Sequence, residues 1–189
     1  MRLELLDLLA GAAFPLMLMT ILSASIFSFA SSDDFVLDLV IMAVGEVSVI
    51  TVLMLFGKQS GTVAYRKTVQ QGKKREIGTG DVKALLSVGE YHIWKGLAIG
   101  LISCVPYVIF QIINCIIPNV FCEFMLLYVF GWAYYPLHFA GASQWLNLLW
   151  VIPAAGFHTL GYFIGGRLEK KKQDEVADLQ TKKDKKKKA

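Results

Sequence analysis

The sequence predicts an all-α integral membrane protein with four transmembrane helices arranged as two hairpins. Of its 189 residues, 55% are apolar and only 18% are charged, which is too apolar a composition for a soluble domain of this size. Lys and Arg are absent from Leu3 to Gly57 and from Gly96 to Gly166. Each interval is long enough for two crossings of about 20 residues, and neither shows the alternation of barrel strands, so the spans are expected to be helices.

Residues 1–57 are expected to form the first transmembrane hairpin. The uncharged run from Leu8 to Ala30 is longer than the apolar core of a secretory signal peptide, about 7 to 15 residues, and therefore predicts a retained span. Asp33 and Asp34 form a short polar turn, and a second apolar run follows from Phe35 to Phe56. Two spans joined by so short a turn must be antiparallel.

Residues 58–93 are predicted to be a basic cytoplasmic loop that contains a short interfacial helix. Basic loops remain on the cytoplasmic side of a membrane, so the two chain termini are expected inside and the turn of the first hairpin outside. Asp81 is placed to cap a short amphipathic helix that leads to Trp94, where the membrane region resumes. The side chains of the loop that we expect to contact lipid headgroups are Arg66, Lys67, Lys73, Lys74 and Arg75.

Residues 94–166 form the expected C-terminal membrane region, with spans from about Trp94 to Ile117 and from about Asn147 to Gly166. The aromatic stretch from Pro118 to Gln144 lies between them, and its length and hydropathy also allow a fifth crossing. A fifth crossing would carry the ten basic residues after Gly166 to the outside, against the charge bias. We therefore favour four spans with a re-entrant or interfacial aromatic segment, and five transmembrane helices are the alternative.

Residues 167–189 are Lys-rich and lack an apolar period, so a disordered cytoplasmic tail is expected. Lys170, Lys171 and Lys172 are candidates for contact with anionic headgroups. Nucleic-acid binding is not expected, because no aromatic residue is interleaved with the lysines. The charge distribution is that of a small multipass protein of a plasma membrane, and a bacterial one is expected.

Glu46 and His158 are the candidate intramembrane polar site. A carboxylate near the centre of a span costs about 3 kcal/mol or more, so Glu46 is expected to face the bundle interior and to find a partner. Both helices should run from outside to inside, and each residue lies 11 positions from the outer end of its span (46 − 35 and 158 − 147). The pair is therefore expected to meet at equal depth, either as a proton or cation site or as a static contact that fixes helix register.

Two pairs of glycines have the four-residue spacing that lets helix backbones approach closely: Gly96 with Gly100, and Gly161 with Gly165. Packing within the monomer is favoured over dimerisation, although a homo-oligomer remains a second interpretation.

Three classes of function remain for such a protein: a non-enzymatic membrane component, a transporter or channel subunit, and a membrane enzyme. The sequence lacks a Gly-x-Ser-x-Gly elbow, a Walker loop, a His-Glu-x-x-His helix and a dinucleotide-binding fingerprint. An enzyme is therefore not expected, and neither are catalytic residues, a metal or a cofactor. The favoured class is a non-enzymatic accessory, scaffold or regulatory membrane component whose partners are the lipid bilayer and a membrane complex. The alternative is a small transporter or channel subunit that uses Glu46 and His158.

Overall fold

The computed structural model describes residues 2–27, 35–79, 91–134, 141 and 143–188. All the regular secondary structure in these residues is helical, as expected. The long helices are α1 (Arg2–Phe27), α2 (Phe35–Thr79), α3 (Ile93–Ile116) and α6 (Val151–Lys188), and the short elements are α4 (Val120–Phe124), η2 (Met125–Val129) and η3 (Gln144–Trp150).

Four helical segments in the described part of the chain are long and apolar enough to cross a membrane. They lie within Leu8–Ser25, Phe35–Gln70, Trp94–Ile116 and Gln144–Gln180. The second and fourth stretches also include polar turns beyond their apolar parts, and the fourth combines η3 with α6. Most side chains in these stretches are not buried within the chain, as expected of helices that face lipid as well as one another.

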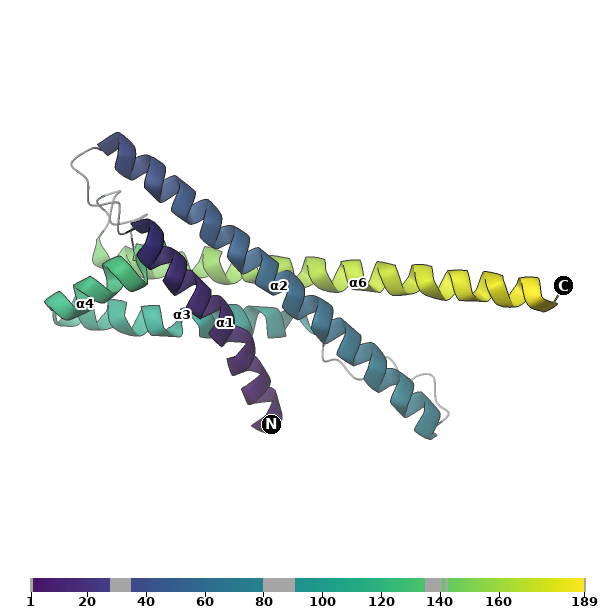
Figure 1. Cartoon of the computed structure of the whole chain (residues 1–189). Coiled ribbons are helices and arrows are strands. Elements are labelled where there is room, and N and C mark those ends of the chain that lie inside the picture. Colours follow the sequence, from purple (N-terminus) through teal and green to yellow (C-terminus); the bar gives the residue numbers. More distant parts are fainter. Residues whose placement is uncertain (1, 28–34, 80–90, 135–140, 142, 189) are drawn as a thin grey trace.

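Helices α1, α3 and α4 lie beside the beginning of α6, whereas α2 crosses α6 and separates from it on both sides of the crossing (Figure 1). The end of α1, helix α4 and the beginning of α6 lie together on the left of Figure 1, which we call the α4 end. The far ends of α2 and α6 lie on the right of Figure 1, which we call the arm end, and the beginning of α1 lies below the middle of the picture. Helices α2 and α6 run in the same direction and cross near the middle of the picture.

Helix α2 corrects the prediction of a loop that begins at residue 58. It continues without interruption for 45 residues to Thr79, because this stretch contains no proline and packs against α6 well beyond the apolar run. Residues 80–90, which contain Asp81 and the expected interfacial helix, lie outside the described residues.

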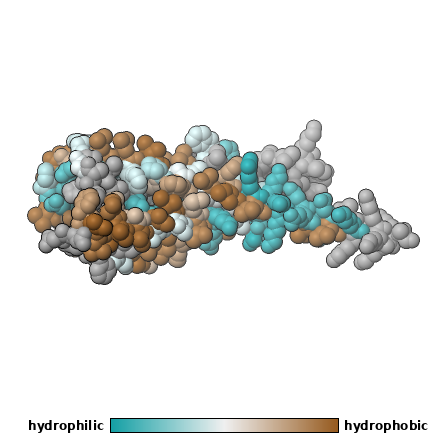
Figure 2. All heavy atoms as spheres, turned by 90° about the horizontal axis from the view of Figure 1, so that it is seen from above, coloured by the Kyte–Doolittle hydropathy of each residue, from teal (hydrophilic) through white to brown (hydrophobic). Residues whose placement is uncertain are grey.

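Helix α6 corrects the prediction of a disordered tail, since it extends to Lys188. Its polar half consists largely of Lys, Glu, Gln, Ala and Leu, which favour helix, and it continues a helix already nucleated in the apolar span. Gln173 also donates a hydrogen bond of 3.3 Å to Glu169, one turn earlier. The space-filling view shows the hydrophilic end of the molecule projecting from the apolar body (Figure 2).

The aromatic segment folds back into the bundle at the α4 end. The side chain of Asn119 begins α4 by accepting hydrogen bonds from the backbone nitrogens of Phe121 and Cys122, at 2.7 and 3.4 Å. The apolar helix that follows spans only Val120–Val129, which is half of the roughly 20 residues that a crossing requires. After it the chain packs inward, and Trp132 is fully buried. Residues 135–140 and 142 lie outside the described residues.

The apolar core lies between α1, α3 and the aromatic segment. Its members are buried residues from five elements and from residues 130–134, which follow η2: Met19, Val49, Leu53, Cys104, Tyr107, Leu126, Phe130, Trp132, Ala133, Tyr134 and Ala154. The core is thus concentrated at the α4 end, and beyond it the bundle is held by the contact between α2 and α6, which is more extensive than that between any other two elements of the described structure.

Candidate functional site

The closest helix contact in the molecule is the crossing of α2 and α6. A Cβ atom added at Gly57 would meet the backbone oxygen of His158, and one at Gly61 would meet that of Tyr162. From the other side, Gly161 lies against the backbone of Met54, and Gly165 lies in the same way against Lys58. The two backbones therefore touch, and a larger residue at any of the four glycines would push the helices apart.

Helix α3 joins this crossing through the other predicted glycine pair, Gly96 and Gly100. A Cβ atom at Gly96 would lie 2.7 Å from the Tyr162 ring, and one at Gly100 would lie 3.1 Å from the Cα atom of Ala155. All four glycines singled out in the sequence thus lie at contacts within a single chain. Gly57 and Gly61 have the same spacing, and that spacing is the signal by which they could be found.

His158 is fully buried at this crossing. Its Nδ1 lies 3.0 Å from the backbone oxygen of Gly96, and because a carbonyl can only accept, Nδ1 donates. Nε2 has no hydrogen-bond partner among the described residues. The imidazole therefore connects α6 to α3.

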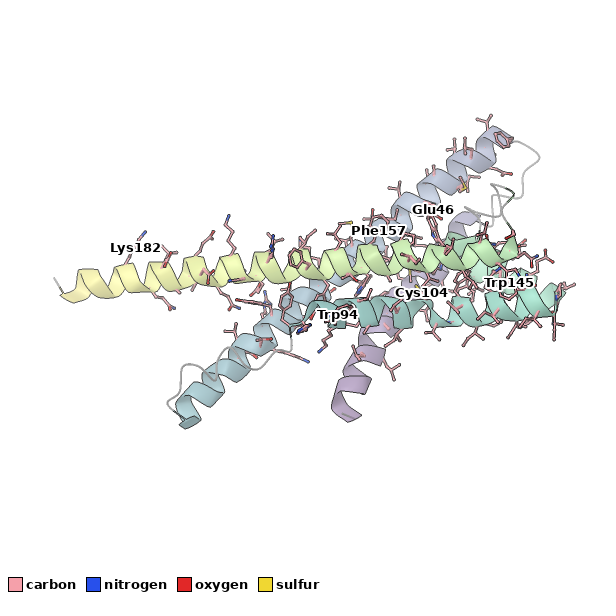
Figure 3. The ribbon with its side chains drawn as sticks, turned by 180° about the vertical axis from the view of Figure 1, so that it is seen from behind. Glu46, Trp94, Cys104, Trp145, Phe157 and Lys182 are labelled. Carbon is pink, nitrogen blue, oxygen red and sulfur yellow. The ribbon has the colours of Figure 1, made fainter. Side chains whose placement is uncertain are left out.

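Glu46 lies elsewhere, against the α6 residues nearer the α4 end (Figure 3). The space beside it is about 10 Å³ and is lined by Val49, Ile50, Leu53, Trp132, Trp150, Pro153, Ala154 and Phe157. One carboxyl oxygen is buried and has no hydrogen-bond partner in the described part of the chain. Apart from Glu46, every lining residue is apolar or aromatic.

The expected pairing of Glu46 with His158 is wrong, because the two side chains face different neighbours. Glu46 lies against Phe157 and the α6 residues before it, whereas the imidazole of His158 faces Gly96 of α3. Neither the buried Oε1 of Glu46 nor Nε2 of His158 has a hydrogen-bond partner among the described residues. Counting from the ends of the apolar runs gives the approximate depth of a residue but not the direction in which its side chain points.

Beyond the glycine crossing, an ion pair joins the polar parts of the two helices. Arg66 binds Glu169 through two hydrogen bonds, Nε to Oε1 at 2.8 Å and Nη2 to Oε2 at 3.1 Å. The Glu169 side chain is only 10% exposed, and the guanidinium of Arg66 lowers the pKa of this carboxyl below its usual value. Arg66, which was expected to contact lipid headgroups, is thus held by α6.

The other predicted headgroup-contact residues are distributed along the two helices. Lys67 is exposed on α2, and Lys170, Lys171 and Lys172 are exposed on α6. The last turns of α2 carry Lys73, Lys74 and Arg75, whose side chains lie outside the described part of the structure.

Aromatic contacts attach the residue just before α3, Tyr91, to the crossing of α2 and α6. Tyr91 stacks on Tyr162 with ring centroids 5.3 Å apart and an angle of 6° between the planes, and it meets Tyr65 edge-on at 5.7 Å. Its hydroxyl donates to the backbone oxygen of Phe163 at 3.2 Å. Tyrosine spacing in the sequence gives no indication of this cluster, because its members come from three separate segments.

Polar contacts attach the aromatic segment and η3 to the bundle at the α4 end. The Tyr107 hydroxyl donates to the backbone oxygen of Asn147 at 2.9 Å. The Gln111 amide donates to the backbone oxygen of Gln144 at 2.7 Å, and the backbone nitrogen of Trp132 donates to the Ser23 hydroxyl at 3.1 Å. These bonds satisfy irregular backbone that apolar surroundings would otherwise leave unpaired.

No family model, curated protein or solved structure matches this chain. Within the described residues, no group of three or more His, Cys, Asp or Glu side chains is arranged to hold a metal ion. The features from which a function can be inferred are the close packing of α2 against α6, the isolated carboxyl group of Glu46 and the buried imidazole of His158. To these the polar parts of α2 and α6 add an ion pair.

Proposed function

We propose that this protein is a non-enzymatic membrane scaffold whose bundle holds two helical arms for a partner in a membrane complex. The arms are the polar continuations of α2 and α6 beyond their crossing. The observation that carries the proposal is that α6 runs on for 22 residues from Gly166 to Lys188 (188 − 166), about 33 Å at 1.5 Å per residue.

The arms also present apolar side chains outside the apolar spans. Val176 and Leu179 are 47% and 59% exposed on α6. Val176 borders a notch of about 440 Å³ between the two helices, which Val69 and Ala177 also line. Val176 and Leu179 are three residues apart and therefore share one face of α6, and neighbouring apolar side chains exposed on an otherwise charged helix can form a patch that binds another protein.

The membrane arrangement that goes with this function has four crossings, both arms in the cytoplasm and a re-entrant aromatic segment at the outer face of a bacterial plasma membrane. Its support is electrostatic, because ten of the 19 basic residues follow Gly166 and eight lie between Lys58 and Lys95, and basic segments are retained on the cytoplasmic side.

The packing favours a scaffold over a transporter. The space of about 10 Å³ at Glu46 is near the minimum of about 10 to 15 Å³ that a single water needs. Moreover, the buried Oε1 of Glu46 and Nε2 of His158 each lack a hydrogen-bond partner among the described residues, so the two groups do not form a shared polar site.

Site-specific photocrosslinking in living cells tests the proposal. A photoreactive residue at Val176 or Leu179 is expected to give discrete protein adducts. The control positions Leu101 and Ile109, exposed on the apolar part of α3, should give none of the same species. Absence of adducts from both arm positions, combined with an ion flux in proteoliposomes that Glu46→Gln abolishes, would overturn the scaffold in favour of transport.

A further inference from the structure

The carboxyl group of Glu46 lies in the middle of an apolar run. Phe35 begins the run 11 residues before Glu46 (46 − 35), and Gly57 follows 11 residues after it (57 − 46). Each interval rises about 16 Å at 1.5 Å per residue, and half of a hydrocarbon core is about 15 Å thick. In the proposed threading, Glu46 therefore lies near the bilayer midplane, where a carboxylate needs a partner most.

No described side chain of this protein offsets a charge on Glu46. Its buried Oε1 has no hydrogen-bond partner in the described part of the chain. Trp132 lines the space beside it, but an indole nitrogen donates a hydrogen bond without carrying a charge. The nearest imidazole along α6, that of His158, is directed at the backbone oxygen of Gly96.

A second copy of this protein cannot supply the missing cation either. Lys and Arg are absent from Leu3 to Gly57 and from Gly96 to Gly166, and these two intervals contain the apolar parts of all the proposed spans. Every copy has the same intervals, so a homodimer would bring no Lys or Arg to the depth of Glu46. A cation that pairs with Glu46 must come from a different protein.

Glu46 can be approached from outside the bundle, because the space beside it is closed on one side only. Four of the lining residues are buried and belong to the apolar core: Val49, Leu53, Trp132 and Ala154. The others are only partly buried, as is Glu46 itself: Ile50, Trp150, Pro153 and Phe157. Glu46 thus lies at an edge of the bundle, on the part of α2 that separates from α6 toward the α4 end (Figures 1 and 3).

Helix α2 has an uncovered face beside this edge. Only 17% of the residues in its apolar window are buried, against 22 to 39% in the other three spans. Leu39 and Ala43 are exposed and precede Glu46 by seven and three residues, so they lie on the same side of the helix. Ala43 is small enough for another helix to pack closely against α2 at this point.

We propose that the edge of the bundle at Glu46 binds a transmembrane helix of another protein, and that this helix carries a Lys or Arg near its own midpoint. The partner helix packs along Leu39 and Ala43, and its cation lies against the Glu46 carboxylate. Each charge is costly alone in an apolar environment, so each selects the other. The contact goes beyond the scaffold role of the arms, since it lies inside the apolar region and requires neither arm to be occupied.

The test is photocrosslinking from Ala43 of the full-length protein in living cells, with mass spectrometry of the adduct. The crosslinked peptide is expected to come from an apolar span of another protein that contains a Lys or Arg. In Glu46→Gln the yield per molecule should fall about tenfold, because an interhelical polar contact has lost its charge. Glu46→Asp, which keeps the charge, should recover most of the adduct. The matched control Thr51→Val removes an exposed hydroxyl from the same helix and should leave the yield unchanged.

Four results would overturn the proposal: no adduct from Ala43, an adduct only with a second copy of this chain, a crosslinked span without Lys or Arg, or an equal yield in Glu46→Gln. The arms are tested separately, because adducts from Val176 and Leu179 should persist in Glu46→Gln. Loss of the Ala43 adduct alone would therefore contradict the contact at Glu46 and leave the scaffold role standing. Loss of the arm adducts alone would have the reverse meaning.

Discussion

At the residue scale, Glu169 is the polar side chain whose structural role is clearest, because it joins α6 to α2 through Arg66. It is nearly buried on α6, accepts two hydrogen bonds from Arg66 and accepts a third from Gln173. A bidentate pair of this geometry is more effective than an ordinary surface ion pair, because the planar guanidinium fits the carboxylate without further ordering.

The pH dependence of stability follows from this ion pair. The hydrogen bond from Arg66 is the main cause that lowers the pKa of Glu169 in the folded protein from its usual value of 4.5. The pair therefore stabilises the fold fully above pH 4.5, and this contribution is lost as the pH falls through the lowered pKa. Thermal unfolding in detergent should show a Tm that drops below pH 4.5 in the wild-type protein.

The variant Glu169→Gln should show a lower Tm at pH 7 and a smaller drop in acid, because the group that titrates is gone. Lys170→Gln, which alters an exposed neighbour, serves as the control and should follow the wild-type curve. An acid transition of the same size in Glu169→Gln would assign the effect to other carboxylates.

Residue chemistry predicts which polar side chains matter in this sequence, but not which of them meet. An acid within an apolar run and an imidazole within another are recognisable from composition. Their relative depth depends on the contacts of Gly57, Gly61, Gly161 and Gly165, which fix how far α2 slides along α6. Hydropathy locates the ends of an apolar run only within a few residues, and it contains no information about the position of α2 along α6.

At the scale of elements, the contact between α2 and α6 depends on the absence of a side chain at four positions. The variant Gly61→Ala places a Cβ against the backbone oxygen of Tyr162, and backbone cannot move aside as a side chain can. We expect a loss of stability of about 1 to 3 kcal/mol, as for overpacking in other well-packed interiors, measured by denaturant unfolding in micelles.

Gly156 provides a matched control on the same helix. A Cβ added there meets nothing within 4 Å, so Gly156→Ala should stabilise α6 by up to about 1 kcal/mol through helix propensity alone. The two substitutions are chemically identical and are expected to act with opposite signs. Equal effects would show that the crossing of α2 and α6 is not as close as the contacts indicate.

The sequence predicts where helices exist better than where they end. The four apolar runs coincide with helices α1, α2, α3 and α6, because a span must satisfy its own backbone. The polar continuations of α2 and α6 were predicted as loop and disorder, because they lack an apolar period. Their helicity rests on propagation from the spans and on the contact of Arg66 with Glu169, and neither is an apolar pattern.

At the scale of the whole molecule, the two longest helices run in the same direction, cross near the middle and separate again (Figure 1). Composition predicts the all-helical class, since an apolar chain with two cation-free intervals has few other solutions. The separation of the arms and the packing of the aromatic segment depend on long-range contacts, such as that of Trp132 with Ser23, and no local pattern indicates them.

The proposed threading is tested by single cysteines in a variant whose native Cys104, Cys115 and Cys122 are changed to Ala. Asn119 and Ser143 are exposed at either end of the aromatic segment, and Lys172 is exposed on the α6 arm. If the arms are cytoplasmic and the aromatic segment is re-entrant, an impermeant maleimide added to intact cells should label Asn119→Cys and Ser143→Cys. Lys172→Cys should react only after the membrane is made permeable.

The pattern of labelling separates the alternatives, because a fifth crossing places the two ends of the aromatic segment on opposite sides. Labelling of only one of Asn119→Cys and Ser143→Cys in intact cells would therefore establish five crossings. Labelling of Lys172→Cys in intact cells would place the α6 arm outside and would contradict the retention of basic segments on the cytoplasmic side.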